Sequence, residues 1–379
     1  MCGDGWRRML EGRVAYAFIS HWSALEALRV LEGERPTWPR KPRLLPVFGE
    51  CVRNQRMFRE TCPPSDLMAW GIRERPVDLL VPHENMRSRG KSARFHVWKW
   101  PIPRQAMLHL SDNVLVSKPS FVVMQMAGYH HKVMPLADEF GHQLRAERDV
   151  LDRAGINERP LFDNPITWDL TVRLVELTKV ICELLGTYRL GTGGASTQYG
   201  MQPLMDRSDV REMLDELPGL YGLNRVHQAL GFAYDMSASP METALALMLT
   251  LPPQVGGFGL PRPRLNVALG VKDPKVVHAG CDEVYPDLYW PSARLVLEYE
   301  SFEFHVAMGG RKLADDAARA NALAAQQYVV LRATDETMRS LGELDLLARQ
   351  IATVLEVELP EIDAVGRLRR ERLHALLLR

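Results

Sequence analysis

The sequence predicts an α/β protein made of two parts. Its 379 residues exceed the length of one ordinary domain, and its composition, 46% hydrophobic and 25% charged, is that of a soluble globular protein. Helical and strand-like hydrophobic periods alternate, most clearly from Ser239 to Leu355, where the order is helix, three strands, helix, strand, helix. The pattern therefore indicates a mixed α/β N-terminal half followed by an αβββαβ domain.

Short elements of both kinds fill the first part of the chain. An apolar run at Val14 to Ile19 precedes a helix over Ser23 to Leu31, where apolar residues recur at helical spacing. Prolines make Arg35 to Pro46 an extended connector. A helix is expected at Pro119 to Met126. Before it, short runs bounded by Pro, Asn or Ser predict a small sheet at Val77 to Pro82, Phe95 to Trp100, Met107 to Leu110 and Val114 to Ser117.

The middle of the chain, Leu136 to Leu185, has mainly helical periodicity and ends in a glycine-rich loop. The clearest helix follows, because Ser239 is an N-cap residue, Pro240 suits the first helical position and Glu242 completes a capping box. After it we expect strands at Arg264 to Leu269, Val284 to Trp290 and Arg294 to Glu300, a helix at Lys312 to Gln327, a strand at Tyr328 to Arg332 and a helix at Glu336 to Leu355.

These elements divide the chain into four predicted regions. They are a basic α/β domain at 1–134, a mainly helical connecting region at 135–235, the αβββαβ domain at 236–357 and a basic amphipathic helix at 358–379.

Basic residues are concentrated in the N-terminal half, although the whole chain carries 47 basic and 47 acidic residues. Between Arg40 and Arg94 there are twelve basic residues against six acidic ones. From Arg94 to Trp100, cationic and aromatic residues interleave, which is typical of a surface that binds phosphates and stacks on bases. A packed strand with alternating faces, or a solvated basic surface, explains the same residues.

The five cysteines are scattered and form no close pairs, so neither a disulfide framework nor a zinc site is predicted. No run approaches the length of a membrane span, and the N-terminus has no apolar signal segment. We therefore expect a cytoplasmic protein with no membrane association.

Candidate catalytic residues lie on a predicted hairpin between Pro286 and His305. A symmetrical turn around Ser292 places Asp287 opposite Glu298, and residues that face each other in such a pair are about 5 Å apart. Alternation directs Glu298 and Glu300 to the same face. Two carboxylates on a partly buried face cost several kcal/mol unless a positive charge compensates, and a divalent metal ion is the simplest compensation. Glu242 is a candidate third acid.

This order of elements, with PD, then E-x-x, then D-x-x-R, resembles the PD-(D/E)XK nuclease superfamily, and most closely its very short patch repair endonuclease branch. The resemblance covers Ser239 to Leu355, about a third of the chain. It implies a restriction-endonuclease-like fold for this domain. The matching positions are Asp287, Glu298, Glu300, Ser301, His305, Asp316, Arg319 and the helical acid Glu242.

The resemblance implies Mg²⁺-dependent (or Mn²⁺-dependent) hydrolysis of phosphodiester bonds in DNA. Asp287, Glu298 and the carbonyl of Tyr299 would hold the metal, and His305 would position or protonate phosphate oxygens. Asp316 and Arg319 would contact the substrate. The chain departs from the family in one respect, because Glu300 stands where the family has a lysine. Two basic residues further along, Arg311 and Lys312, are candidate replacements.

Simpler interpretations remain open. The capping box alone explains Glu242, a helical salt bridge explains Asp316 and Arg319, and His305 suits a strand end. The stretch from Leu79 to Ala127 loosely resembles regions of bacterial abortive-infection antitoxin-related proteins. The alternative function is therefore an inactive DNA-binding or antitoxin-type regulator that uses the nuclease fold as a scaffold. A third possibility is a protein-interaction module in a defence or mobile-element system. A protein partner in a defence or toxin-antitoxin system is also possible.

Overall fold

The computed structural model describes residues 15–30, 48–87, 90–103, 105–128, 165–270, 283–300 and 323–378. The chain divides into two compact units. The first comprises Met1–Gln143, Arg173–Leu185 and Arg189–Gly231, and the second comprises Leu144–Val172, Gly186–Tyr188 and Phe232–Arg379. Residues of the predicted connecting region, 135–235, are thus found in both units.

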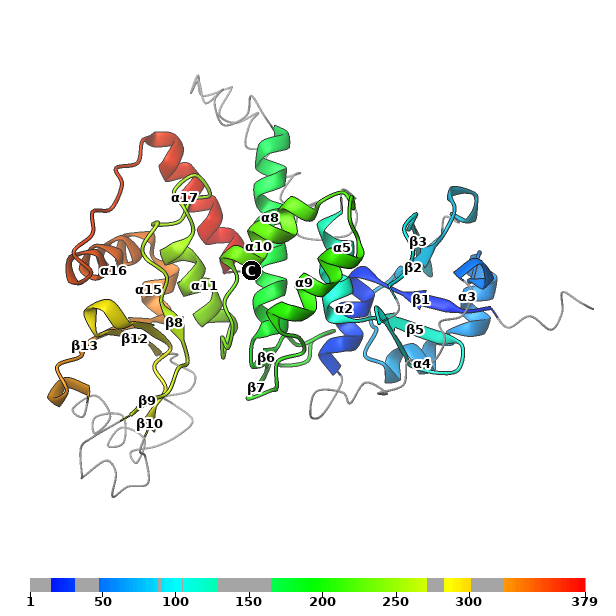
Figure 1. Ribbon diagram of the computed structural model, residues 1–379, viewed down its shortest axis with the longest axis horizontal. Coiled ribbons are helices and arrows are strands. Elements are labelled where there is room, and N and C mark those ends of the chain that lie inside the picture. The colour runs from blue at the N-terminus through cyan, green and yellow to red at the C-terminus, as the bar shows by residue number, and fades with distance from the viewer. Residues whose placement is uncertain are drawn as a thin grey trace, which may run out of the picture. The chain divides into compact units, whose positions relative to one another are not determined.

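A five-stranded mixed sheet forms the centre of the first unit (Figure 1). Its strand order is β3-β2-β1-β5-β4, with β1 parallel to β5 and antiparallel to β2. The three residues of β1 are all apolar, which suits the middle of the sheet, where all three are buried. The strands are β1 (Ala17–Ile19), β2 (Val77–Val81), β3 (Ala93–Val97), β4 (Met107–His109) and β5 (Val114–Ser117).

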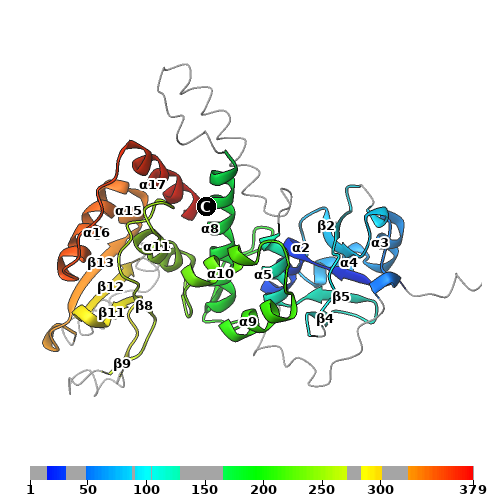
Figure 2. The same cartoon turned by 45° about the horizontal axis from the view of Figure 1, so that its top comes forward.

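Two buried helices, α2 (His21–Val30) and α5 (Pro119–Ala127), lie side by side against this sheet (Figures 1 and 2). Each follows one of the two parallel strands, β1 and β5, so both helices start at the same edge of the sheet. The predicted helices at these positions are confirmed. The described remainder of this unit includes η1 (Phe48–Glu50), α3 (Gln55–Thr61), α4 (Pro64–Ala69), η2 (Glu84–Met86), part of α8 (Pro165–Leu185), β7 (Gln198–Tyr199), α9 (Arg207–Glu216) and most of α10 (Leu223–Phe232).

A buried ion pair links α2 to α8 within the first unit. Arg29 Nε donates a hydrogen bond to Glu183 Oε1, and Arg29 Nη2 donates one to Glu183 Oε2, each with a length of 2.8 Å. Both side chains are buried, and Glu183 also accepts from the backbone N–H of Leu190. Because each charge is compensated by the other, the pair is tolerated in the interior, whereas loss of one partner would leave a buried charge.

The second unit contains a four-stranded sheet with the order β13-β12-β11-β8. β8, β11 and β12 are antiparallel neighbours, and β13 is parallel to β12. The strands are β8 (Arg264–Leu265), β11 (Leu288–Trp290), β12 (Leu295–Glu300) and β13 (Val329–Thr334). A separate two-stranded sheet pairs β9 (Leu269–Gly270) with β10 (Glu283–Val284).

Helices of the second unit lie beside its four-stranded sheet (Figure 1). The predicted helix at Ser239 is confirmed as α11 (Pro240–Thr250), with Ser239 as its N-cap. The predicted C-terminal basic helix is present as α17 (Ala364–Leu377), and α11 and α17 pack against each other. Three leucines of α17, Leu373, Leu376 and Leu377, are buried, which shows that the helix docks on its own unit.

Three predicted elements are divided in the structure. The single strand expected at Arg264 to Leu269 is interrupted by Asn266, which has a φ of 48°, and continues as β8 and β9. The strand expected at Val284 to Trp290 likewise becomes β10 and β11. The last predicted helix is split at Ser340 into α15 (Asp335–Arg339) and α16 (Leu341–Val354), because Ser340 caps the second helix through a bond from Glu343 N.

Among the described residues, no helix combines the length and apolarity needed to cross a membrane.

Candidate active site

The predicted hairpin is confirmed, with the predicted register. β11 and β12 are joined by η3 (Pro291–Ala293), and Leu288 pairs with Leu297 and Trp290 with Leu295. Continuing this register by one residue places Asp287 opposite Glu298. The backbone N of Asp287 is in fact 3.5 Å from Glu298 Oε2. The local turn therefore places Asp287 and Glu298 in neighbouring positions across the hairpin, as expected from the sequence.

Asp287 is also bonded to the backbone of β12. Its Oδ2 accepts a 2.6 Å hydrogen bond from the N–H of Tyr299. This bond takes the place of a strand-to-strand bond at the end of the β11–β12 ladder and fixes the orientation of the carboxylate. The hydroxyl of Tyr299 in turn donates to Asp335 Oδ1 at the start of α15. Asp287 is thus held rigidly beside the Tyr299 backbone whose carbonyl was predicted as a metal ligand.

Glu242 lies in the first turn of α11 and is 7% exposed. Ser239 accepts from the backbone N of Glu242, but Glu242 Oε2 accepts from Ala238 N, one residue before the N-cap. Half of the expected capping box is therefore present. The pKa of the Glu242 carboxyl is raised to about 7, mainly because the group is buried and secondly because of the negative charge of Asp287. Glu242 and Asp287 are hence close enough to repel each other.

Asn266 connects Glu242 to the hairpin, and it was not among the site residues expected from the sequence. Asn266 Nδ2 donates to Glu242 Oε2 at 2.8 Å and to the Met236 carbonyl at 2.9 Å. Its backbone N–H bonds the Pro286 carbonyl at 3.0 Å, next to Asp287. Its φ of 48° is one that Asn tolerates better than most residues. An Asn inside an otherwise strand-like run was the available signal.

Arg332 was also not expected, and among the described residues it is a basic residue that lies next to the acidic residues of β12. Its backbone pairs with Glu298 in the parallel β12–β13 register, and its Nη1 lies 2.7 Å from Glu300 Oε1. Glu300 therefore has a positive partner two residues along the face from Glu298. The signal in the sequence was a single arginine within the apolar strand VVLRAT.

The donor atoms fit a hard divalent cation in their chemistry, since they are carboxylate oxygens of Asp287 and Glu298 with a backbone carbonyl nearby. The pKa of Glu242 is raised first by burial and second by the negative charge of Asp287, and a bound cation would relieve that second contribution. Within the described part of the chain, however, no three carboxylate, imidazole or thiol groups come together as a complete metal cage. The acids are neighbours in pairs, with Asp287 opposite Glu298 and Glu242 close to Asp287. His305, Arg311, Lys312, Asp316 and Arg319 lie outside the described residues.

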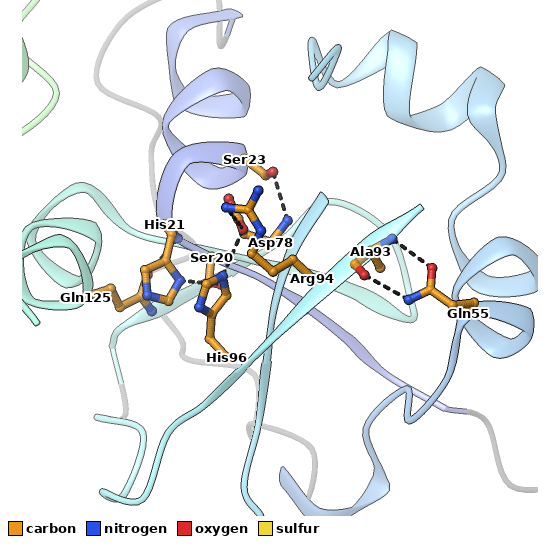
Figure 3. A network of polar contacts seen from close by, with 9 residues as sticks. All are labelled: Ser20, His21, Ser23, Gln55, Asp78, Ala93, Arg94, His96 and Gln125. Carbon is orange, nitrogen blue, oxygen red and sulfur yellow. Dashed lines mark hydrogen bonds and ion pairs between the residues drawn. The ribbon is translucent and has the colours of Figure 1, made fainter. Parts of the chain in front are cut away.

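A second polar cluster lies in the interior of the first unit (Figure 3). His21 and His96 stack with their ring centroids 4.0 Å apart. His96 Nε2 is 2.8 Å from Asp78 Oδ1, and Arg94 Nη1 is 3.6 Å from the same oxygen. The His21 ring nitrogen Nδ1 bonds Ser20 Oγ at 2.8 Å. Apart from Arg94, these side chains are buried.

The bonds of this cluster tie α2 and α5 to the sheet. The N–H of His21 donates to Gln125 Oε1, Gln125 Nε2 donates to Ser117 Oγ, and Ser117 Oγ donates to the Ile19 carbonyl. Each buried polar group thereby has a partner, which avoids a cost of about 1–3 kcal/mol per group. The cluster is therefore a structural support for the start of α2, where His21 has a φ of 50°.

The cationic and aromatic run predicted to bind nucleic acid is largely packed in the interior. Phe95, His96 and Trp98 are at most 6% exposed, and Trp98 packs edge-on against Phe121 of α5. Packing of β3, one of the two simpler interpretations, therefore accounts for Phe95 and His96, and Trp98 packs directly after the strand. Exposed cations around them include Lys91 and Lys99.

Comparison of the chain with protein-family models, curated proteins and solved structures gives no match.

Proposed function

We propose that the second unit is a metal-dependent DNA endonuclease of PD-(D/E)XK type. The observation that carries the proposal is the placement of Asp287 opposite Glu298, with Glu242 close enough for its pKa to respond to Asp287. The sheet order β13-β12-β11-β8, with one parallel pair at β12–β13, supports a restriction-endonuclease-like arrangement.

Asp287, Glu298 and the Tyr299 carbonyl are the proposed ligands of Mg²⁺ or Mn²⁺. Such an ion, when bound, polarises the scissile phosphate and lowers the pKa of water. Asp287 is oriented for this role by the Tyr299 N–H. Glu242, with a pKa of about 7, exchanges a proton with water near neutral pH, and Asn266 fixes its Oε2. His305, Asp316, Arg319, Arg311 and Lys312 remain proposed substrate and catalytic residues on the resemblance.

Nicking of supercoiled plasmid DNA by the purified full chain tests this proposal. We expect cleavage with Mg²⁺ or Mn²⁺ and none with EDTA. Asp287→Ala removes a ligand and should lower the rate at least about a hundredfold, which corresponds to about 3 kcal/mol of activation free energy. Glu358→Gln, an exposed acid in the same unit, is the matched control and should cleave like the wild type. Equal cleavage by Asp287→Ala and the wild type would refute the proposal.

The alternative is a DNA-binding or antitoxin-type regulator that has kept the fold without the chemistry. Two observations favour it: the described residues form no complete three-group metal cage, and Glu300 with its Arg332 partner occupies the place of the family's lysine. This alternative predicts salt-dependent DNA binding by the wild type, no nicking with any divalent metal, and a protein partner in a defence or toxin-antitoxin system.

A further inference from the structure

Arg332 is a basic residue next to the acidic residues of β12. It lies on β13, whose parallel register with β12 sets Arg332 opposite Glu298 and Thr334 opposite Glu300. Partners in register project to the same face of a sheet. Arg332 therefore shares its face with the acids on β12, and with Asp287, which faces Glu298 across the hairpin.

The geometry and exposure of this pair differ from those of a buried structural ion pair. Arg332 Nη1 and Glu300 Oε1 are 2.7 Å apart, and the side chains of Arg332 and Glu300 are 49% and 29% exposed. A guanidinium carries five N–H donors in a planar fork, more than a single carboxylate contact uses. Arg332 is accordingly held in place by Glu300 and is accessible to an anion from solvent.

The site needs a cation at this position for a simple electrostatic reason. A phosphodiester brought next to Asp287 and Glu298 is repelled by both, and Glu300 adds a third negative charge where the family pattern has a lysine. A charge-assisted bond from a guanidinium to a phosphate oxygen offsets that repulsion and, being bidentate, also orients the phosphate.

We propose that Arg332 binds the phosphodiester group of the nucleic-acid substrate, and that Glu300 positions the Arg332 side chain instead of contacting the substrate. The cation thus comes from the neighbouring strand β13 and not from the position two residues after Glu298. This inference rests on one part of the proposed function, namely that the second unit binds DNA at the acidic face of β12.

Binding is measured separately from cleavage, so that the two proposals fail separately. A fluorescently labelled DNA duplex is titrated with the full chain by anisotropy, in Ca²⁺ and again in EDTA. Arg332→Ala should weaken binding about tenfold or more, the loss expected for one charged hydrogen bond to phosphate. Arg332→Lys should recover part of it. Arg339→Ala, an exposed arginine on α15, is the control and should bind within about twofold of the wild type.

Glu300→Gln separates substrate binding from a merely structural ion pair. If the pair serves only to hold the fold, Glu300→Gln and Arg332→Ala should weaken DNA binding alike, in proportion to their loss of thermal stability. If Arg332 binds phosphate, Glu300→Gln keeps a side-chain oxygen that accepts from Arg332 and still positions it, but removes a repelling charge. DNA binding by Glu300→Gln should then be unchanged or tighter, while Arg332→Ala still loses binding.

The outcomes are distinct. Wild-type binding that depends on Arg332, without cleavage in any metal, supports this inference and overturns the endonuclease. Cleavage and binding that are the same in Arg332→Ala and the wild type overturn this inference and leave the endonuclease standing. A wild-type chain that binds no DNA in either condition overturns both.

Discussion

Replacing Glu242 by Gln tests the electrostatics of the acidic site without any assumption about activity. The pKa of this carboxyl rises from an ordinary 4.5 to about 7 on folding, first because the group is buried and second because Asp287 repels its charged form. A pKa difference of this size corresponds to about 3 kcal/mol of folding free energy. Gln keeps the shape and an oxygen that can accept from Ala238 N and Asn266 Nδ2.

The sign of the effect follows from which state loses its proton first. Below a pH of 4.5 the carboxyl is protonated in the folded and unfolded states, so it contributes no pH dependence. Between 4.5 and about 7 only the unfolded state ionises, and the stability of the wild type falls as the pH rises. Above about pH 7 the carboxyl is ionised in both states, and the wild type bears the full loss of stability. Because Gln cannot ionise, the stability of Glu242→Gln relative to the wild type should grow by about 3 kcal/mol from about pH 4.5 to about pH 8.

The assay is urea unfolding in EDTA at a series of pH values, followed by pulsed hydrogen exchange and mass spectrometry of peptides from β12. Hydrogen exchange of the β12 peptides reports the free energy of unfolding of the second unit alone. Glu358→Gln, an exposed acid in the same unit, is the control and should track the wild type at every pH. A stability difference between Glu242→Gln and the wild type that stays constant with pH, or shrinks as pH rises, refutes the assignment of a raised pKa to Glu242.

Three further predictions concern stability and are read by urea unfolding at neutral pH. Asn266→Gly should lower the free energy of unfolding by about 1.5–3 kcal/mol, because the bond to Glu242 is lost. Asn266→Ala should lower it by about 1 kcal/mol more, because Ala is strained at positive φ. Equal losses for the two variants would contradict this. Glu183→Ala should cost about 3–5 kcal/mol by removing the carboxylate that compensates the buried charge of Arg29, and adding Arg29→Met should recover most of it. Asp78→Ala should cost about 1–3 kcal/mol, and a smaller loss would show that the histidine cluster is not a support.

The sequence by itself determined the local features of the second unit. The Ser-Pro-Met-Glu segment fixed the start of α11, because a capping side chain and a proline act within one turn. The short turn between β11 and β12 fixed the hairpin register and so the neighbouring positions of Asp287 and Glu298. Alternation along β12 then determined which acids share a face. In each case the interacting residues are close in sequence.

Only the tertiary structure decided which distant residues complete the site. Asn266 interrupts a strand-like run because its side chain bonds Glu242 on α11, a contact that no local periodicity encodes. The pairing of Arg332 with Glu298 and Glu300 depends on the parallel register of β12 and β13. A parallel pair is joined by a long crossover and not by a tight turn, so its register is set by packing of the sheet faces. For the same reason the raised pKa of Glu242 follows from the burial of α11 and its approach to Asp287, both of which are properties of the folded unit.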